Sequence, residues 1–150
     1  MSNFRPFAPS PSAATAGNMT FTCEQGRVRV DGDIQLTRDR VGLDAARALE
    51  AIADALVAAL PAAASARSPV DPYAEDSSSV SVGAMTVENG LDRIAFYGTD
   101  TIGHDAAGAV VAATIRALAS AIVATLSADR GLPDKVAVTA TVDTVPNPFG

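Results

Sequence analysis

Two stretches of similar pattern decide the fold that this sequence predicts: RVRVDGDIQLTRD at residues 27–39 and RIAFYGTDTIGHD at residues 93–105. Each places apolar residues at alternate positions, carries a glycine near its middle and ends at an aspartate ahead of an alanine-rich segment. Apolar residues at every second position are typical of a β-strand with one buried face. The pair therefore predicts two long strands, each followed by a helix.

The similarity extends well beyond these stretches. Residues 19–62 align with residues 85–128 without a gap, and the alignment gives 14 identities in 44 positions. Six identities are alanine pairs, which an alanine-rich chain produces easily. The others include three pairs that matter for backbone geometry: Gly32 with Gly98, Asp39 with Asp105, and Gly42 with Gly108. An ungapped match that keeps glycines and apolar positions together predicts an internal duplication.

The fold class that follows is α+β. We expect two ββα units plus a C-terminal strand, with both helices on one face of a sheet rich in antiparallel pairs. The first strand of each unit lies in NMTFTCE or VSVGAMTVE, and EQG or ENG makes the turn after it. The expected helices are 44–61 and 105–128, with Asp105 capping the second and Asp44 a candidate cap for the first.

The expected organisation is one domain with extended ends. Proline and serine punctuate the N-terminus, the middle of the chain and the C-terminus, where packed elements are disfavoured. The segments are an extended N-terminal arm at 1–12, a single domain at 13–145 and a tail at 146–150. Within the domain we expect repeats at about 13–62 and 79–128, a linker at 63–78 and a final strand at about 135–145.

The two helices differ in how much apolar surface they carry. On a helical wheel one face of each is apolar and should cover the sheet: Leu49, Ile52, Leu56 and Leu60, or Ile115, Leu118, Ile122 and Leu126. A flanking stripe of small residues should let the helices pack together: Ala51, Ala55 and Ala59 against Ala117, Ala121 and Thr125. On the third flank the first helix carries Arg47, Glu50 and Asp54, whereas the second carries Ala113, Arg116, Ser120 and Ala124. That second set predicts a contact with a partner subunit.

Both ends of the chain pair phenylalanine with proline. Phe4 and Phe7 lie in NFRPFAPSPS, and Phe149 lies in VPNPFG. Proline stiffens an extended chain, and an exposed aromatic ring can anchor it in a groove of another protein. These residues, with the flank of the second helix, are the candidate interface.

Composition excludes several classes of function. The 150-residue chain has a formal net charge of −6, which argues against a nucleic-acid-binding surface. Its longest apolar segment, between Asp105 and Asp129, is alanine-rich and contains Arg116, so a buried helix is favoured over a membrane span. Cys23 is the only cysteine, and the N-terminus lacks the apolar run of a signal peptide. The sequence predicts a cytoplasmic protein, or a component of a virion.

No arrangement of residues points to catalysis. His104 is the only histidine and is better explained as a polar residue at a helix entrance. The spacing of Asp31, Asp33 and Asp39 does not match a calcium-binding loop. We expect no catalytic, cofactor-binding or metal-binding residues.

The function these observations favour is that of a non-catalytic assembly subunit. It would form homo-oligomers through its second helix and its tails, and a virus or bacteriophage particle is one setting that fits. The alternative is a small regulatory or inhibitory module that binds another protein. A third is a small-ligand site in a groove near Tyr97 and His104.

Overall fold

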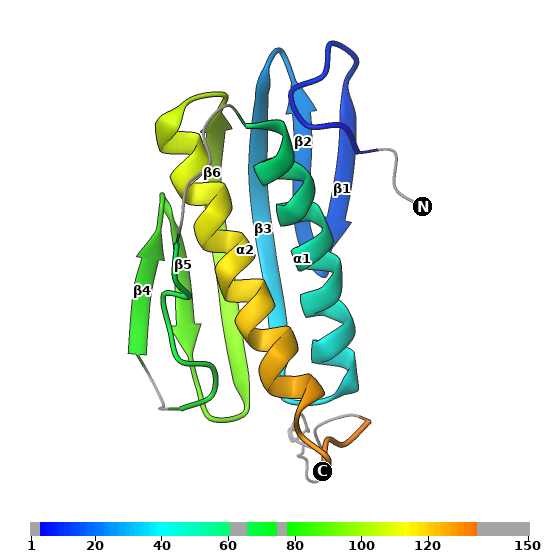
Figure 1. Cartoon of the computed structure of the whole chain (residues 1–150), viewed down its shortest axis with the longest axis vertical. Helices are drawn as coiled ribbons and strands as arrows, with labels where there is room; N and C mark the ends of the chain where they lie inside the picture. Colours follow the sequence, from blue (N-terminus) through cyan, green and yellow to red (C-terminus); the bar gives the residue numbers. More distant parts are fainter. Residues whose placement is uncertain (1–3, 61–65, 75–77, 135–150) are drawn as a thin grey trace, which may run out of the picture.

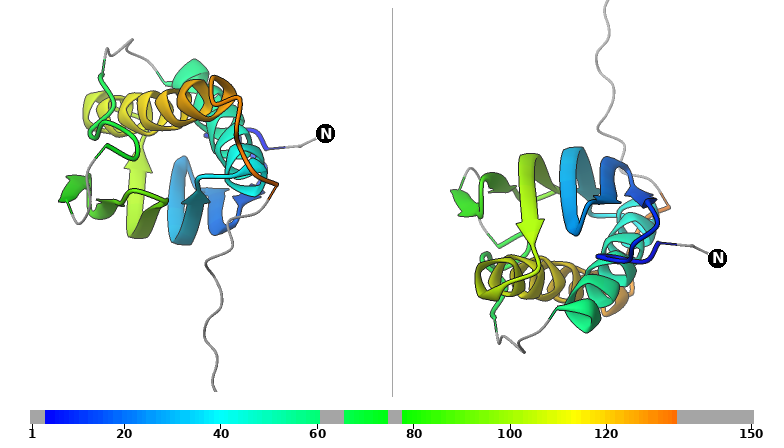
Figure 2. Two further views of the ribbon diagram at one scale, coloured as in Figure 1. Left: turned by 90° about the horizontal axis from the view of Figure 1, so that it is seen from below. Right: turned by 90° about the horizontal axis from the view of Figure 1, so that it is seen from above.

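The computed structural model describes residues 4–60, 66–74 and 78–134 of the chain. Six strands form one antiparallel sheet in the order β1-β2-β3-β6-β5-β4, and two helices lie side by side on one face of it (Figures 1 and 2). The α+β class and the position of both helices agree with the expectation. The elements are β1 (Ser12–Ala16), β2 (Asn18–Glu24), β3 (Arg27–Thr37), α1 (Arg40–Ala59), β4 (Ser78–Val82), β5 (Met85–Asn89), β6 (Arg93–Gly103) and α2 (Ala106–Ser127).

Each half of the described chain is a βββα unit, so the expected ββα unit was wrong by one strand. The stretch VSVGAMTVE was expected to form one strand, but Gly83 has a φ of 61° and reverses the chain there, so that Val82 pairs with Met85. In the first half the additional strand is β1, which begins where the N-terminal arm was expected to end. A two-residue loop of this kind joins adjacent antiparallel strands.

The alignment of the two halves in sequence also relates their elements. The alignment can be extended toward the N-terminus to include β1 and β4. The first and last residues of β1 then align with those of β4, and the first and last residues of β3 align with those of β6. The first residue of α1 likewise aligns with the first residue of α2. The pairing of the outer strands is equally matched, since Ser12 lies opposite Cys23 and Ser78 lies opposite Asn89. The two halves therefore have the same order of elements and the same register.

Two glycines lie opposite each other at the centre of the sheet. Gly32 of β3 pairs with Gly98 of β6, midway along an unbroken ladder of eleven residues in each strand. Their φ values are 118° and 126°, which residues with a Cβ rarely adopt. A Cβ on Gly32 would lie 2.1 Å from the carbonyl oxygen of Asn18. These glycines therefore allow a close backbone approach, and the strands pair through this point without a bulge.

Both helices begin at an aspartate cap. The Oδ1 atom of Asp39 accepts a hydrogen bond from the amide of Gly42 at 2.7 Å, and that of Asp105 accepts one from Gly108 at 2.8 Å. Side-chain capping of this kind satisfies an amide that has no partner within the helix. The expectation for Asp105 is confirmed. Asp44 lies exposed within α1, which begins before the residue expected to cap it.

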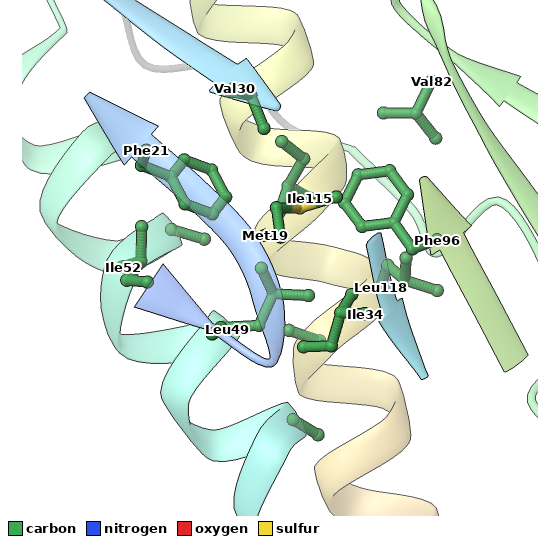
Figure 3. Close-up of a cluster of buried hydrophobic side chains, with 14 of the residues drawn as sticks. Met19, Phe21, Val30, Ile34, Leu49, Ile52, Val82, Phe96, Ile115 and Leu118 are labelled. Carbon is green, nitrogen blue, oxygen red and sulfur yellow. The ribbon is translucent and has the colours of Figure 1, made fainter. Parts of the chain in front are cut away.

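The hydrophobic core lies between the helices and the sheet. All eight residues of the expected core faces are buried, and Figure 3 shows Leu49 of α1 and Leu118 of α2 among strand residues such as Met19 and Phe96. Complete burial of an aliphatic side chain contributes about 1.5–3 kcal/mol to stability. The helices therefore hold the sheet through the apolar stripe that the sequence predicted.

The seam between the helices lies on a different flank from the one expected. The two helices run antiparallel (Figure 1), and the Ser120 hydroxyl donates a 2.7 Å hydrogen bond to the Glu50 carboxylate. Ala51, which was expected in the seam, is exposed. A helical wheel identifies the face toward the sheet, but it does not say on which side a neighbouring helix lies.

The described chain ends beside the start of α1. The Pro133 carbonyl accepts a hydrogen bond from the Arg40 amide at 3.0 Å, and the Arg40 side chain forms an ion pair with Asp134 at 3.0 Å. The expected final strand at 135–145 and the tail at 146–150 lie outside the described residues.

Candidate functional site

Two proline–aromatic turns brace opposite ends of the sheet. In the first, the Ala8 amide donates to the Arg5 carbonyl at 3.2 Å, and in the second the Ala74 amide donates to the Asp71 carbonyl at 3.1 Å. The aromatic residue inside each turn has a positive φ, 65° at Phe7 and 63° at Tyr73. The two turns therefore share one backbone geometry, although one was expected to be an extended arm and the other a linker.

Each aromatic ring contacts the helix entrance of the other half. The Phe7 ring meets the His104 ring edge-on, with 5.1 Å between their centroids, and His104 precedes the Asp105 cap of α2. The Arg38 guanidinium lies 5.8 Å from the Tyr73 ring centroid, and Arg38 precedes the cap of α1. These contacts are reciprocal, so the two halves hold each other at both ends.

Polar atoms hold the two turns to different degrees. The Phe7 amide donates to the Cys23 sulfur at 2.8 Å, whereas the Tyr73 amide donates to the Asn89 side-chain oxygen at 3.0 Å. The Tyr73 hydroxyl also donates to the Leu36 carbonyl at 2.8 Å. Burial, with a smaller effect from the Asp39 carboxylate, raises the pKa of the Tyr73 phenol well above its usual range. The turn at Tyr73 is therefore the more firmly fixed.

The N-terminal phenylalanines, expected to anchor in another protein, also contact the chain itself. Phe4 and Phe7 are partly buried and pack against the chain's own core, and their role in a contact with another protein stays a prediction. Phe7 lies beside Cys23, which is completely buried near the end of β2. Phe149 lies outside the described residues.

The expected interface on the second helix divides into two sets. Ala113 is only 4% exposed and Ser120 is hydrogen-bonded to α1, so the chain itself already covers these two positions. Arg116 is half-buried, and among the residues described no carboxylate lies within ion-pair distance of its guanidinium. Ala124 is exposed. Of the four, Ala124 is the most available to another molecule.

One face of α2 that the chain leaves partly uncovered is its outward face, six residues spaced by three or four positions. All six are uncharged, and Val110 is 55% exposed. Only 44% of the most apolar 18-residue stretch of α2 is buried within the chain. The outward face consists of Ala107, Val110, Thr114, Ala117, Ala121 and Ala124, each exposed or half-buried.

By length and composition α2 could cross a membrane, and it is the one such helix among the residues that the structure describes. Its other face, however, buries Ile115, Leu118 and Ile122 completely against the sheet. The core helix of a soluble domain passes the same test of length and composition, so this finding is weak evidence for a span.

The opposite face of the sheet carries no helix (Figure 2) and is lined by polar side chains. Thr99 donates a hydrogen bond to Asp31 at 2.7 Å, and the Tyr97 hydroxyl donates to Glu88. The hydrogen bond to Glu88 raises the pKa of the Tyr97 phenol. On this exposed face, therefore, the Asp31 and Glu88 carboxylates each accept a hydrogen bond from a hydroxyl of β6.

Tyr97 and His104, near which a ligand groove was expected, lie on different parts of the structure. Tyr97 lies on the bare face of the sheet, whereas His104 lies past the end of β6 and donates a 2.9 Å hydrogen bond to the Ala59 carbonyl. The extended chain between them spans about 20 Å. Within the described ranges no group of three potential metal ligands comes together.

The sequence contained a signal for the braced turns that the predicted repeat did not include. Extending the same alignment toward the N-terminus pairs Pro6 with Pro72, Phe7 with Tyr73 and Ala8 with Ala74. A proline before an aromatic residue and a small residue, found at matched positions in both halves, would have predicted equivalent turns.

Comparison with known proteins does not assign this fold or surface to a family. No protein-family model, no curated protein and no solved structure matches the chain.

Proposed function

We propose that the chain is a non-catalytic assembly subunit that forms a homo-oligomer by covering the outward face of α2 with a second copy. The observation that carries this proposal is a 22-residue helix whose outward face of six residues bears no charge, with the half-buried Arg116 on another flank. A solvated helix face normally carries charged residues, as α1 does with Asp44, Arg47 and Asp54. The cytoplasm, or a virus or bacteriophage particle, is the setting we propose.

A second copy is the partner that this surface fits best. Small residues at three- and four-residue spacing allow two helix axes to approach within about 8 Å. The outward face is also uniform along its length, so it can pack against itself across a two-fold axis without placing like charges together. A partner of opposite charge would require charges on this face, and the face has none.

The size of the contact requires more than α2. A helix of 22 residues is about 33 Å long and about 10 Å wide, so it buries about 330 Å² per chain. A stable interface needs about 800 Å² per partner. We therefore infer that the contact extends beyond α2 over further surface of the chain.

The experiment is a measurement of mass in solution by light scattering, for the wild-type chain and three variants. We expect the wild type to exceed its 15.2 kDa chain mass by an integer factor. Val110→Glu and Ala124→Glu should give the mass of one chain, because each places a charge in an apolar contact. Ala13→Glu, at an exposed alanine of β1, should leave the mass unchanged. A wild-type mass of one chain would reject assembly and support the alternative of a monomeric regulatory or inhibitory module.

We also propose that the two βββα halves descend from one duplicated unit. The constant offset between equivalent elements, the matching aspartate caps and the reciprocal aromatic contacts support it. If so, side chains at equivalent positions should make comparable contributions to stability, which the substitutions of Leu56 and Ile122 described below test.

A further inference from the structure

One end of the bare sheet face contains an open pocket of about 210 Å³. Arg27 and Arg29 occupy alternate positions in β3, so both side chains project from the same face. Thr101 of β6 lies directly opposite Arg29 in the ladder. The pocket lining comprises Glu24, Gln25, Arg27, Arg29 and Thr101.

The charges of this pocket are not balanced by the chain. Among the described residues no carboxylate lies within ion-pair distance of Arg27 or Arg29. Asp31, the next residue on the same face, accepts a hydrogen bond from Thr99 at 2.7 Å. Glu24 is the one acidic residue of the lining, and it lies opposite Arg27 in the ladder with β2. The lining therefore has two cations and one anion in a chain whose net charge is −6.

We propose that this pocket binds a phosphate group, either as the free ion or as the monoester of a small molecule. A guanidinium presents several N–H donors in a planar fork, and two such forks can share the oxygens of one phosphate. The Thr101 hydroxyl and the Gln25 amide add donors at the rim. Pockets for drug-sized ligands occupy about 300–1,000 Å³, so this one suits a single phosphate group.

The other half of the chain provides a matched control for this site. At the equivalent positions of the second half, Arg93 corresponds to Arg27, but Ala95 replaces the second arginine. Thr101 likewise corresponds to Gln35 in the first half. Arg93 is thus an exposed arginine at the start of β6, in the same fold environment, without the paired arginine that the proposal requires.

The test is a titration of amide chemical shifts, with inorganic phosphate and with ribose 5-phosphate, in buffer of low ionic strength. We expect saturable shifts confined to residues near 24–29 and 99–103. Arg29→Ala should weaken the affinity about tenfold or more, and Arg93→Ala should change it by less than about twofold. Glu24→Gln should strengthen binding about two- to fivefold, because a like charge leaves the site.

Tighter binding of ribose 5-phosphate would identify a monoester site, and equal binding would identify a site for the free ion. The absence of saturable shifts with both probes would overturn the proposal. So would an equal loss of affinity in Arg29→Ala and Arg93→Ala, which would indicate attraction of ions by any exposed arginine. Glu24, Arg29 and Arg93 alternate with the buried residues of their strands and so lie on the sheet face away from the helices, and this result does not depend on the proposed assembly.

Discussion

Replacing Gly32 with alanine should destabilise the chain more than the same change at Gly98, although the two glycines face each other at the centre of the sheet. Both have φ values near 120°, where a residue with a Cβ is strained by about 1–3 kcal/mol. Alanine recovers about 0.5–1 kcal/mol of this, because it loses less backbone freedom on folding than glycine. The conformational cost is therefore similar at the two positions.

The surroundings distinguish the two glycines. The new Cβ would lie 2.1 Å from the Asn18 carbonyl oxygen at Gly32, but 3.2 Å from the Met85 Cα at Gly98. The first contact forces the β1–β2 turn to move by about 1 Å, which costs about 1–3 kcal/mol, the range for an overpacked interior. We expect losses of about 1–5 kcal/mol for Gly32→Ala and about 0–2.5 kcal/mol for Gly98→Ala, so the loss at Gly32 should be larger by about 1–3 kcal/mol.

Urea denaturation of the two variants measures this difference in the free energy of unfolding. Gly26→Ala is the control, because Gly26 has a φ of 76° and no atom within 4 Å of the added Cβ. It should cost about 1 kcal/mol. Equal losses at Gly32 and Gly98, or a larger loss at Gly98, would refute the argument from close backbone approach.

Three further predictions concern the caps, the core and the buried phenol. Asp105→Ala should lower the free energy of unfolding by about 0.5–2 kcal/mol, the usual cost of losing a helix cap. Asp39→Ala should lower it by more, because the buried Asp39 carboxylate also accepts a hydrogen bond from the Thr37 hydroxyl. Thermal melts at pH 7 compare the two variants. Leu56→Ala and Ile122→Ala should each lower the free energy of unfolding by about 2–5 kcal/mol, and a negligible loss at either would contradict equivalent core roles. Tyr73→Phe removes a buried hydrogen bond and should cost about 1 kcal/mol at pH 8. Because the pKa of Tyr73 is raised in the folded chain, this group's full contribution to the free energy of unfolding is present below about pH 10. Above that pH the contribution falls by at most about 1.4 kcal/mol per pH unit. Urea midpoints measured across pH 8–11 should show that Tyr73→Phe lacks this part of the pH dependence.

The sequence predicted what depends on periodicity. Alternation located β3 and β6, and the apolar stripes of both helices located the core, because burial on one face leaves a direct mark on residue choice. The same reasoning missed the break at Gly83, since a glycine inside an alternating stretch permits either a continuous strand or a hairpin. Helix neighbours were misplaced because alanine packs acceptably on any flank.

The candidate interface was harder to predict for a similar reason. Whether Phe7 anchors a partner or covers its own core depends on where the chain folds back, and no local pattern specifies that return. Ala113 and Ala124 look alike in sequence, yet one is buried in the chain and the other is exposed. The difference is set by the position of α1 across the sheet.

The reciprocal aromatic contacts have a consequence for the connection between the halves. Each half places an aromatic ring over the helix entrance of the other half, and β3 and β6 pair along their whole length. The two halves are therefore held together by contacts at both ends of the sheet and along its middle. A covalent connection between the halves then adds mainly equal numbers and a high local concentration of each half. Two separate fragments with the same surfaces would contain all the described contacts needed to complement each other, as subunits of a dimer do.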